Sequence, residues 1–447
     1  MMLRSDRPQL LFFIVAMALA LALGTIPGYY SHDELQWLGL AQTARSLTAL
    51  PWVDFADLAP FQYRPLTFNL WLLLAYLGDE RTEFMHGAFA LLAVADALLL
   101  VALLRRCAVE VSRAWLGASL FLMLPSTVFT AGWVGTLADL LVATIALVAL
   151  WLAQNERLRS DVWPAPIAFG STALALMAKE SALVLPLLWL MIGLLRARPR
   201  AAAWGLAGAS AAVLCYLALR ADPLLHPAYV DPYYDWRLAY LPWRIADYLL
   251  FLPLPSVEEA HTILLRSVAS LVAAALLIGL WLFGCWWRAR WRGLAVVAVS
   301  LAAIGPALLL PKASAHFAYV AGLVLAAGCA WLPIARAQSL QYLNVLLLFL
   351  LGWHDVNLLR RFHRDAAVQT NLLDGALAAG ADVRPLRLRA ADPDVVHLLA
   401  RSAHATQWRR RSLKLVVSAP DEDGAVDFLV LADGRLQPAG RRSVSAN

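Results

Sequence analysis

The sequence is poor in charge and in cysteine. Only 15% of its 447 residues are Asp, Glu, Lys or Arg, and four are Cys. Soluble domains carry about 25% charged residues, so the composition excludes an ordinary soluble enzyme. Three of the cysteines, Cys215, Cys285 and Cys329, lie within apolar runs, and no C-x-x-C spacing occurs. We therefore expect neither a disulfide framework nor a thiolate metal site.

Motifs of nucleotide chemistry are also lacking. The chain has no Walker loop, no dinucleotide-binding fingerprint, no nucleophile elbow and no internal repeat. Phosphoryl transfer from a soluble nucleotide therefore has no support. A net charge of +6 would favour a nucleic-acid partner in a soluble protein, but here the arginines stand in short loops between apolar runs. We expect no nucleic-acid partner.

Apolar sequence dominates instead. Apolar residues make up 61% of the chain, which also contains 18 Trp, and many runs approach the roughly 20 residues that a transmembrane helix needs. The sequence predicts an all-α polytopic membrane protein embedded in the lipid bilayer. We expect about eleven transmembrane helices, near residues 9–27, 83–105, 115–132, 135–154, 162–178, 180–196, 202–221, 262–286, 293–311, 317–335 and 339–353.

The arginines indicate an orientation. An odd number of spans places the two termini on opposite sides, and the arginine-rich loops all fall on the side of the N-terminus. Because cytoplasmic loops carry an excess of Lys and Arg, the N-terminus is expected to be cytoplasmic and the C-terminus periplasmic. High Ala, Leu and Arg usage suits a GC-rich bacterium, so we expect a multi-pass protein of the bacterial inner (plasma) membrane. The arginines on this side are Arg4, Arg7, Arg105, Arg106, Arg113, Arg157, Arg159, Arg196, Arg198, Arg200, Arg288, Arg290, Arg292 and Arg336.

The apolar runs stop after Trp353, and the remaining sequence is polar. We therefore divide the chain into a transmembrane domain, residues 1–355, and a small soluble periplasmic C-terminal region, residues 356–447. Within that region 358–379 is expected to be helical, and three short apolar stretches are typical of strands. A small α/β region is predicted, with strands near 383–388, 413–417 and 428–431.

Two adjacent carboxylates, Asp33 and Glu34, follow the first apolar run. The predicted orientation places them at the outer membrane surface, beside an apolar wall suited to a lipid-linked substrate. A carboxylate in that environment can act as a general base. The alternative is an exposed helix start, because acidic side chains are favoured in a first helical turn.

Cations that could hold a phosphate follow at three places. Arg64 offers a planar fork that matches phosphate oxygens. Lys179 and Lys312 are flanked by apolar sequence, where a charge usually faces a cavity, although either side chain could snorkel to the interface instead. Glu180, beside Lys179, indicates a shared polar site. Asp139 falls at the outer end of its predicted span and could complete that site.

Two further features stay ambiguous. Asp96 lies in the middle of a predicted span, where we expect it to pair with a polar group of another helix or to be protonated. The outward segment 221–261 contains seven Tyr and Trp residues. These aromatic side chains could form an interfacial belt or stack on a sugar.

Taken in chain order, these motifs resemble the GT-C glycosyltransferases, relatives of the protein O-mannosyltransferases and of the lipid A aminoarabinose transferase. The resemblance covers roughly the first 355 residues. It rests on short motifs that occur in the family's order, namely Asp33-Glu34, Tyr63-Arg64-Pro65-Leu66, Gly135-Thr136-Leu137-Ala138-Asp139, Met177-Ala178-Lys179-Glu180-Ser181 and Lys312 to Tyr319.

The resemblance implies a role for each motif. Asp33 would be the catalytic base, and Glu34 would orient a neighbour or a substrate hydroxyl. The remaining residues would bind the donor phosphate (Arg64, Lys179, Lys312, His316 and Tyr319) or line the substrate cavity (Tyr63, Asp139 and Glu180). The chain departs from the family at His316-Phe317-Ala318-Tyr319, where an Arg-Tyr start is common, so the cation there is Lys312 or His316. No tetratricopeptide array follows.

These features predict an inverting glycosyltransferase, a hexosyl- or pentosyltransferase with a periplasmic active site that contributes to cell-envelope glycosylation. It would move a sugar from a polyprenyl-phosphate carrier to a periplasmic acceptor, which is a lipid, a glycan or a protein. Phosphate is a good leaving group, so a divalent metal is compatible with the reaction but not required, and no cofactor is expected. The alternative is a transporter or flippase of lipid-linked sugars, with Asp96, Asp139, Lys179 and Glu180 along its path.

Overall fold

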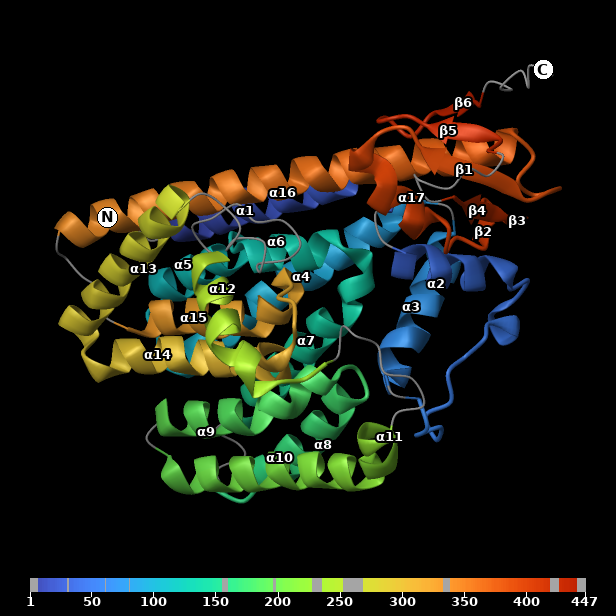
Figure 1. Cartoon of the computed structure of the whole chain (residues 1–447). Helices are drawn as coiled ribbons and strands as arrows, with labels where there is room; N and C mark the ends of the chain where they lie inside the picture. The colour runs from blue at the N-terminus through green and yellow to red at the C-terminus, as the bar shows by residue number, and fades with distance from the viewer. Residues whose placement is uncertain are drawn as a thin grey trace, which may run out of the picture.

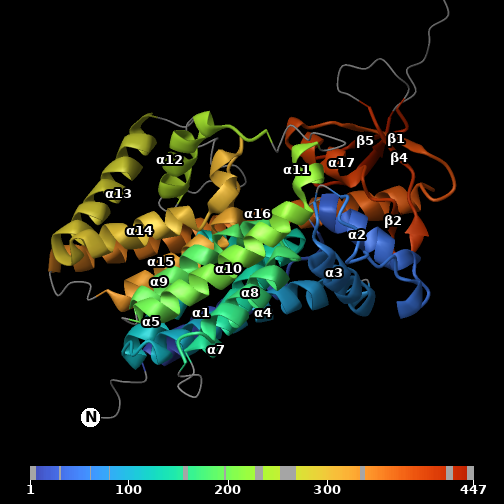
Figure 2. The ribbon, with the colours of Figure 1, turned by 90° about the horizontal axis from the view of Figure 1, so that it is seen from below.

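The computed structural model in Figure 1 is a bundle of helices with a small sheet at one end. It describes residues 7–29, 32–60, 62–79, 81–154, 160–195, 198–226, 235–251, 268–332, 338–418 and 426–439. Both Figure 1 and Figure 2 place the β-strands beside α2 and α3, with α13 and α14 at the opposite end. The two ends of the bundle therefore differ, because one carries the small sheet and the other carries α13 and α14.

The first half of the chain supplies most of the buried core. Its helices are α1 (Arg7–Gly24), α2 (His32–Thr43), α3 (Pro65–Gly78), α4 (Thr82–Arg106), α5 (Val111–Leu122), α6 (Pro125–Gly132), α7 (Leu137–Ala153), α8 (Pro164–Leu176), α9 (Leu185–Leu195) and α10 (Pro199–Leu219). Short 3₁₀ turns precede α7 and α9 at η3 (Val134–Thr136) and η4 (Glu180–Val184), and another forms η2 (Leu47–Ala49).

The second half adds further helices, one of which, α16, is very long. They are α11 (Ala221–Leu225), α12 (Leu241–Phe251), α13 (Val268–Ala289), α14 (Trp291–Ala302), α15 (Tyr319–Trp331), α16 (Gln338–Ala378) and α17 (Val396–Ser402). The 3₁₀ turns of this half are η6 (Leu238–Tyr240), η8 (Gly305–Leu309), η9 (Ala315–Ala318) and η10 (Pro393–Val395).

Each of the eleven predicted spans overlaps a helix, although residue 196 and the stretches 262–267 and 333–335 of three of these spans lie outside the described residues. Within the described residues, five helices are long and apolar enough to cross a membrane, or six if α5 and α6 count as one bent span. The bend between α5 and α6 is 58°, and it occurs where Pro125 removes a backbone donor at the start of α6. Several other apolar helices are shorter, and one of them, α3, was not predicted. The chain is a multi-pass membrane protein.

Helix α16 differs from its prediction. The sequence suggested a span at 339–353 and a separate helix at 358–379, but the structure has one continuous helix of 41 residues. No Pro or Gly interrupts residues 354–357, so nothing ends the helix there. At 1.5 Å per residue α16 is roughly 60 Å long, enough to cross a bilayer and extend well beyond it. It passes residue 355 without a break and connects the bundle to the C-terminal sheet (Figure 1).

The predicted α/β character of the C-terminal region is confirmed. Its strands are β1 (Leu386–Ala390), β2 (Gln407–Trp408), β3 (Arg411–Ser412), β4 (Leu415–Val417), β5 (Phe428–Val430) and β6 (Leu436–Pro438). One sheet has the order β4-β1-β5-β6, with β1 parallel to β4 and β5, and β6 antiparallel to β5. Strands β2 and β3 form a separate antiparallel hairpin.

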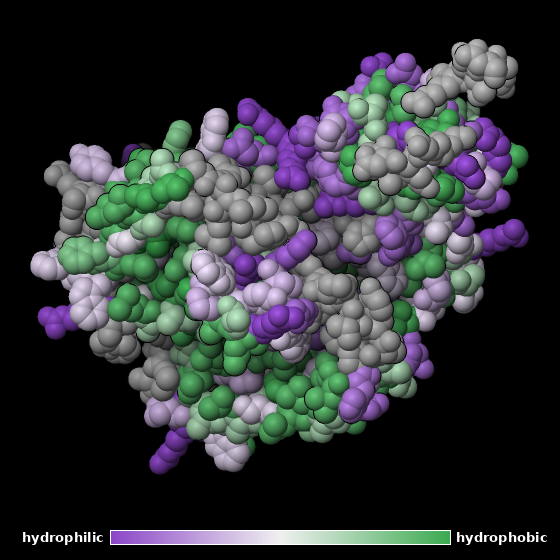
Figure 3. Space-filling model, in the orientation of Figure 1, coloured by the Kyte–Doolittle hydropathy of each residue, from purple (hydrophilic) through white to green (hydrophobic). Residues whose placement is uncertain are grey.

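Surface polarity follows this division. Figure 3 shows hydrophobic residues over the helical bundle and hydrophilic residues over the C-terminal region. Lipid replaces water around a transmembrane bundle, so exposed apolar side chains such as Leu91 (70%) and Leu214 (66%) are favourable there. The sheet end is built for contact with water.

Candidate active site

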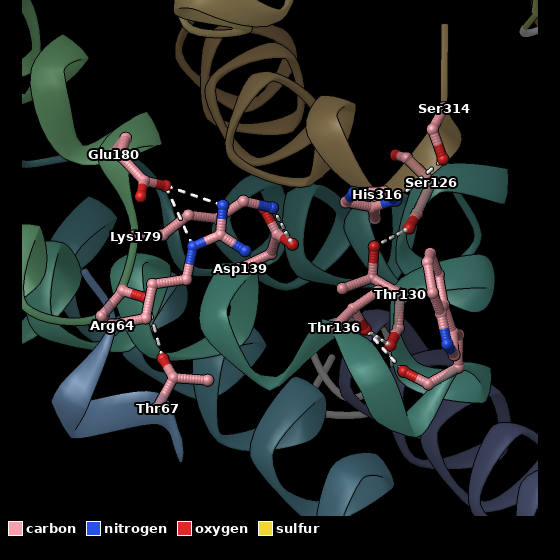
Figure 4. Close-up of polar contacts among 12 residues, drawn as sticks. Arg64, Thr67, Ser126, Thr130, Thr136, Asp139, Lys179, Glu180, Ser314 and His316 are labelled. Atoms are coloured by element: carbon pink, nitrogen blue, oxygen red, sulfur yellow. Dashed lines mark hydrogen bonds and ion pairs between the residues drawn. The ribbon is translucent and has the colours of Figure 1, made fainter. Parts of the chain in front are cut away.

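Arg64 and Glu180 form an ion pair near one end of the bundle, although 116 positions separate them. The guanidinium Nε and Nη2 atoms both donate to Glu180 Oε2, at 3.0 and 2.8 Å (Figure 4). Both side chains are largely buried, with 16% and 20% exposure. The Arg64 fork therefore already holds an anionic oxygen.

The backbone fixes Arg64 in this place. Pro65 occupies the first position of α3, where its missing N–H is harmless. The Leu66 N–H donates to the carbonyl of Met177 at 3.1 Å, and the Thr67 hydroxyl donates to the carbonyl of Ala178 at 2.9 Å. The Leu66 N–H lies in the first turn of α3, where it has no partner within the helix. These two hydrogen bonds hold the Tyr63-Arg64-Pro65-Leu66 motif against the residues that precede Lys179.

Lys179 and Asp139 form a second, deeper ion pair. The ammonium Nζ donates to both carboxylate oxygens of Asp139, at 2.8 and 2.6 Å, and both side chains are about 95% buried. Lys179 also lies 4.7 Å from the ring centroid of Phe317, a cation–π contact. Arg64 and Glu180 interact electrostatically with this pair, so the four groups make one polar cluster.

A narrow pocket of about 60 Å³ opens beside this cluster. Its polar wall includes Arg64, Lys179 and Glu180. Its other walls are largely apolar, and many of them come from η8 and the residues on either side of η8. The apolar lining residues are Leu224, Trp236, Ile304, Pro306, Ala307, Leu310 and Phe317. This combination of a cationic wall and apolar walls suits the phosphate end of a lipid. Of the aromatic segment 221–261, Trp236 lines the pocket, whereas Tyr229, Tyr233 and Tyr234 lie outside the described residues.

The acid pair lies on the first turn of α2. Glu34 is fully buried, and its Oε1 accepts a hydrogen bond of 2.7 Å from the backbone N–H of Val134. Its carboxylate therefore joins α2 to the first residue of η3, the turn that immediately precedes α7. Asp33 is only partly buried in the same turn. The two neighbours thus have different environments: Glu34 serves a packing contact, and Asp33 is accessible.

His316 lies among aromatic rings. It belongs to η9 and is 92% buried, and its Nδ1 lies 2.8 Å from the hydroxyl of Ser314. Its ring stacks on Phe129 with centroids 6.4 Å apart and meets Trp133 edge-on at 5.1 Å. Figure 4 shows it on the far side of the Lys179–Asp139 pair from Glu180. His316 is close to the cluster but does not line the pocket.

Tyr319 is engaged elsewhere. It is completely buried on α15, and its hydroxyl donates to Asp96 Oδ2 at 2.9 Å. Thr144 of α7 donates to the other oxygen of Asp96 at 2.6 Å. The prediction that Asp96 pairs with polar groups of other helices is confirmed. Tyr319 joins α15 to α4 instead of lining the pocket.

Tyr63 leads to a residue that the sequence did not single out. Its hydroxyl donates to the carbonyl of Phe55 at 2.7 Å, and burial raises its pKa although nearby Arg220 opposes the shift. Arg220 is fully buried at the end of α10, lies 5.4 Å from the Tyr63 ring centroid and donates to the carbonyl of Leu58. Its position at the end of the apolar run 202–221 was the only available signal. Arg220 attaches the outward loop to the bundle.

From the sequence, Lys312 was expected to bind the donor phosphate, and a divalent metal was considered compatible with the reaction but not required. Lys312 is exposed just before η9 and does not line the pocket. Within the described residues, no group of three His, Cys, Asp or Glu side chains is placed to hold a metal ion. Among the described residues that line the pocket, the cationic side chains are therefore Arg64 and Lys179.

No protein-family model and no curated protein match the sequence significantly. The structure, however, is similar to the crystal structure of ArnT from Cupriavidus metallidurans in the apo state. The two chains are 13% identical, with a TM-score of 0.50, and the similarity covers 92% of this chain and 86% of that one. This likeness shows that the chain has the same overall fold as ArnT.

Proposed function

We propose that this GT-C-fold protein is an inverting glycosyltransferase of the bacterial inner membrane, with its N-terminus cytoplasmic and its active site and C-terminus periplasmic. It takes a sugar from a polyprenyl-phosphate carrier and passes it to a periplasmic acceptor. The observation that supports this most is that two largely buried cations, Arg64 and Lys179, line the same pocket, whose other walls are apolar. Buried intramembrane charges are costly and usually mark a functional site.

Arg64 is the main phosphate ligand in this proposal. Its two N–H donors converge on one carboxylate oxygen of Glu180, the arrangement that a phosphate oxygen would also accept. Glu180 stands where the donor phosphate would bind. Because both Arg64 donors are already occupied by Glu180, donor binding would require the Arg64–Glu180 pair to open.

Lys179 supplies the second positive charge. Its partner Asp139 neutralises it in the absence of substrate, which keeps the buried ammonium tolerable. When the bond between the anomeric carbon and the phosphate oxygen breaks, its electron pair goes to that oxygen, and the negative charge of the carrier phosphate grows. Preorganised cations stabilise this developing charge in the transition state. A divalent metal is not required for this step.

Asp33 is the proposed general base. Transfer with inversion needs a group on the opposite face of the sugar to accept the proton of the acceptor hydroxyl while the oxygen attacks the anomeric carbon. Asp33 is partly accessible, whereas the carboxylate of Glu34 is bound to Val134. Glu34 would act as a positioning residue by fixing the first turn of α2.

The substitution Asp33→Asn tests this assignment. It is nearly isosteric, so the protein should fold and bind donor, but transfer should fall on the order of a hundredfold or more because the base is lost. Asp57→Asn, an exposed carboxylate of the same outward loop, is the matched control and should keep wild-type activity. Normal turnover by purified Asp33→Asn would remove Asp33 from the mechanism.

A further inference from the structure

A large apolar cavity of the bundle lies outside the candidate active site. It has a volume of about 440 Å³, within the range of about 300 to 1,000 Å³ typical of small-molecule pockets. Residues of α1, α5, α13, α15 and α16 line it, and nearly all are apolar. Leu11, Leu116 and Leu348 are 39 to 47% exposed, so the cavity opens to the surface that faces lipid.

The cavity begins at the arginine-rich end of the bundle. Arg113 belongs to the first turn of α5, Leu332 directly follows α15, and Asn344 lies near the start of α16. The cavity ends near Leu124 and Leu351, deeper in the bundle. Arg64 and Lys179 lie towards the other end of the bundle, Arg64 at the start of α3 and Lys179 just after α8. The cavity therefore belongs to the leaflet opposite the candidate active site.

Arg113 is the one cationic side chain of this cavity lining. Its Nη2 donates to the backbone carbonyl of Leu332, and within the described residues the guanidinium has no other hydrogen bond and no ion pair. A guanidinium has five N–H donors, so most of them stay available. The side-chain amide of Asn344 adds a neutral donor to the same lining.

We propose that this cavity binds one anionic glycerophospholipid from the leaflet at the arginine-rich end. An acyl chain occupies the apolar cavity, and the phosphate contacts Arg113 and Asn344. Two observations favour this occupant: a cation at the membrane-surface end of a lipid-accessible apolar cavity, and the additional positive charge of Arg105, Arg106 and Arg292 at that end. An anionic headgroup gains from that field, whereas a zwitterionic one gains less.

Native mass spectrometry can test the site directly. The delipidated protein is reconstituted into nanodiscs of equal parts phosphatidylglycerol and phosphatidylcholine, released in the spectrometer, and its retained lipids are counted. Wild type should retain one phosphatidylglycerol in preference to phosphatidylcholine. Arg113→Gln should reduce that preference roughly tenfold, the effect of losing a charge-assisted hydrogen bond. Arg200→Gln, an exposed arginine of the same predicted side but outside the cavity, is the control and should retain it.

A second variant tests the cavity itself. Leu120→Trp, on the α5 wall, should exclude the lipid, and if that protein does not fold, Leu348→Phe on the more exposed α16 wall replaces it. Equal retention of both lipids by wild type, or unchanged phosphatidylglycerol retention in Arg113→Gln, would overturn the proposal. Retention of an added polyprenyl phosphate in place of phosphatidylglycerol would overturn it too. The readout is lipid binding, so it is independent of glycosyl transfer.

Discussion

At the scale of single residues, the main feature is that the two cations proposed to bind the phosphate, Arg64 and Lys179, each form an ion pair with a carboxylate of the same chain. Glu180 neutralises Arg64, and Asp139 neutralises Lys179. An unpaired charge in this setting is expensive, so each carboxylate offsets the cost of burying its cation. The sequence predicted Arg64, Lys179, Glu180 and Asp139 as neighbours.

The pairing itself was not predictable. Nothing in the sequence says which carboxylate faces which cation, because that depends on how the start of α3 attaches to the residues before Lys179. Tyr319 shows the same limit, since its motif indicated the donor site while packing of α15 against α4 directs its hydroxyl to Asp96. Short motifs predict which residue types gather, and tertiary packing decides where each side chain points.

The geometry of Arg64 gives a first prediction. Arg64→Lys keeps the charge but loses the planar fork, so donor binding should weaken roughly tenfold, and Arg64→Gln should weaken it further. Titration of purified protein with a fluorescent polyprenyl-phosphate sugar measures both. Glu180→Gln is the control: it releases Arg64 from a charged competitor and should not weaken binding. Wild-type affinity in both Arg64 variants would show that Arg64 does not hold the phosphate.

The deeper pair predicts a separation of stability from activity. Lys179→Met leaves the Asp139 carboxylate buried without its partner and should cost about 3 to 5 kcal/mol of unfolding free energy. The double variant Lys179→Met/Asp139→Leu should recover most of that stability, because neither charge is then buried, but not the transfer activity. Denaturant unfolding in detergent measures the first effect and a transfer assay the second. An active double variant would assign the pair a purely structural role.

At the scale of elements, the C-terminal region is packed against the helix that carries the acid pair. A Cβ atom added at Gly39 of α2 would lie 3.0 Å from the Thr406 hydroxyl, and Arg410 forms an ion pair of 2.9 Å with Asp79 at the end of α3. Arg409 and Arg410, which form the turn between β2 and β3, have φ angles of 48° and 56°. This backbone costs energy for non-glycine residues and is held by ion pairs, including that of Arg409 with Asp374.

The sequence predicted the elements of this region but not their contact with α2. Strands were expected near 383–388, 413–417 and 428–431 from their apolar residues, and β1, β4 and β5 overlap these stretches. The packing depends on side chains such as Gln36, which lies 3.3 Å from the His404 ring nitrogen, and such long-range pairs have no sequence signal. Contact between the two parts supports a role of the C-terminal region in positioning α2.

The turn before β6 provides a prediction for this element. Gly434 has a φ of +84°, and an added Cβ would lie 2.1 Å from the Val368 carbonyl of α16. Gly434→Ala should therefore detach the β5–β6 hairpin and make the C-terminal region sensitive to limited proteolysis. Gly380→Ala is a matched control, since its φ is +86° but no atom lies within 4 Å of the added Cβ. Equal protease resistance of wild type and Gly434→Ala would show that this contact does not anchor the hairpin.

At the scale of the whole molecule, the bundle has two distinct ends. One carries α2, the C-terminal sheet and the pocket lined by Arg64 and Lys179, as Figures 1 and 2 show for α2 and the sheet. The other carries Arg105, Arg106 and Arg292 and the cavity lined by Arg113. The apolar runs and the arginines between them predicted that the two ends of the bundle differ, because both signals extend over whole segments. A glycosyltransferase and a transporter of lipid-linked sugars would share it, so the distinction between them rests on chemistry.

The most direct test is a reconstitution of the protein in vesicles with a polyprenyl-phosphate donor whose sugar is radiolabelled, together with a periplasmic extract. A glycosyltransferase should release the free carrier phosphate and produce labelled acceptor, and Asp33→Asn should abolish both. A transporter would move the labelled lipid across the vesicle membrane and produce neither. Translocation without carrier release or labelled acceptor, in wild type and Asp33→Asn alike, would contradict the proposed glycosyl transfer.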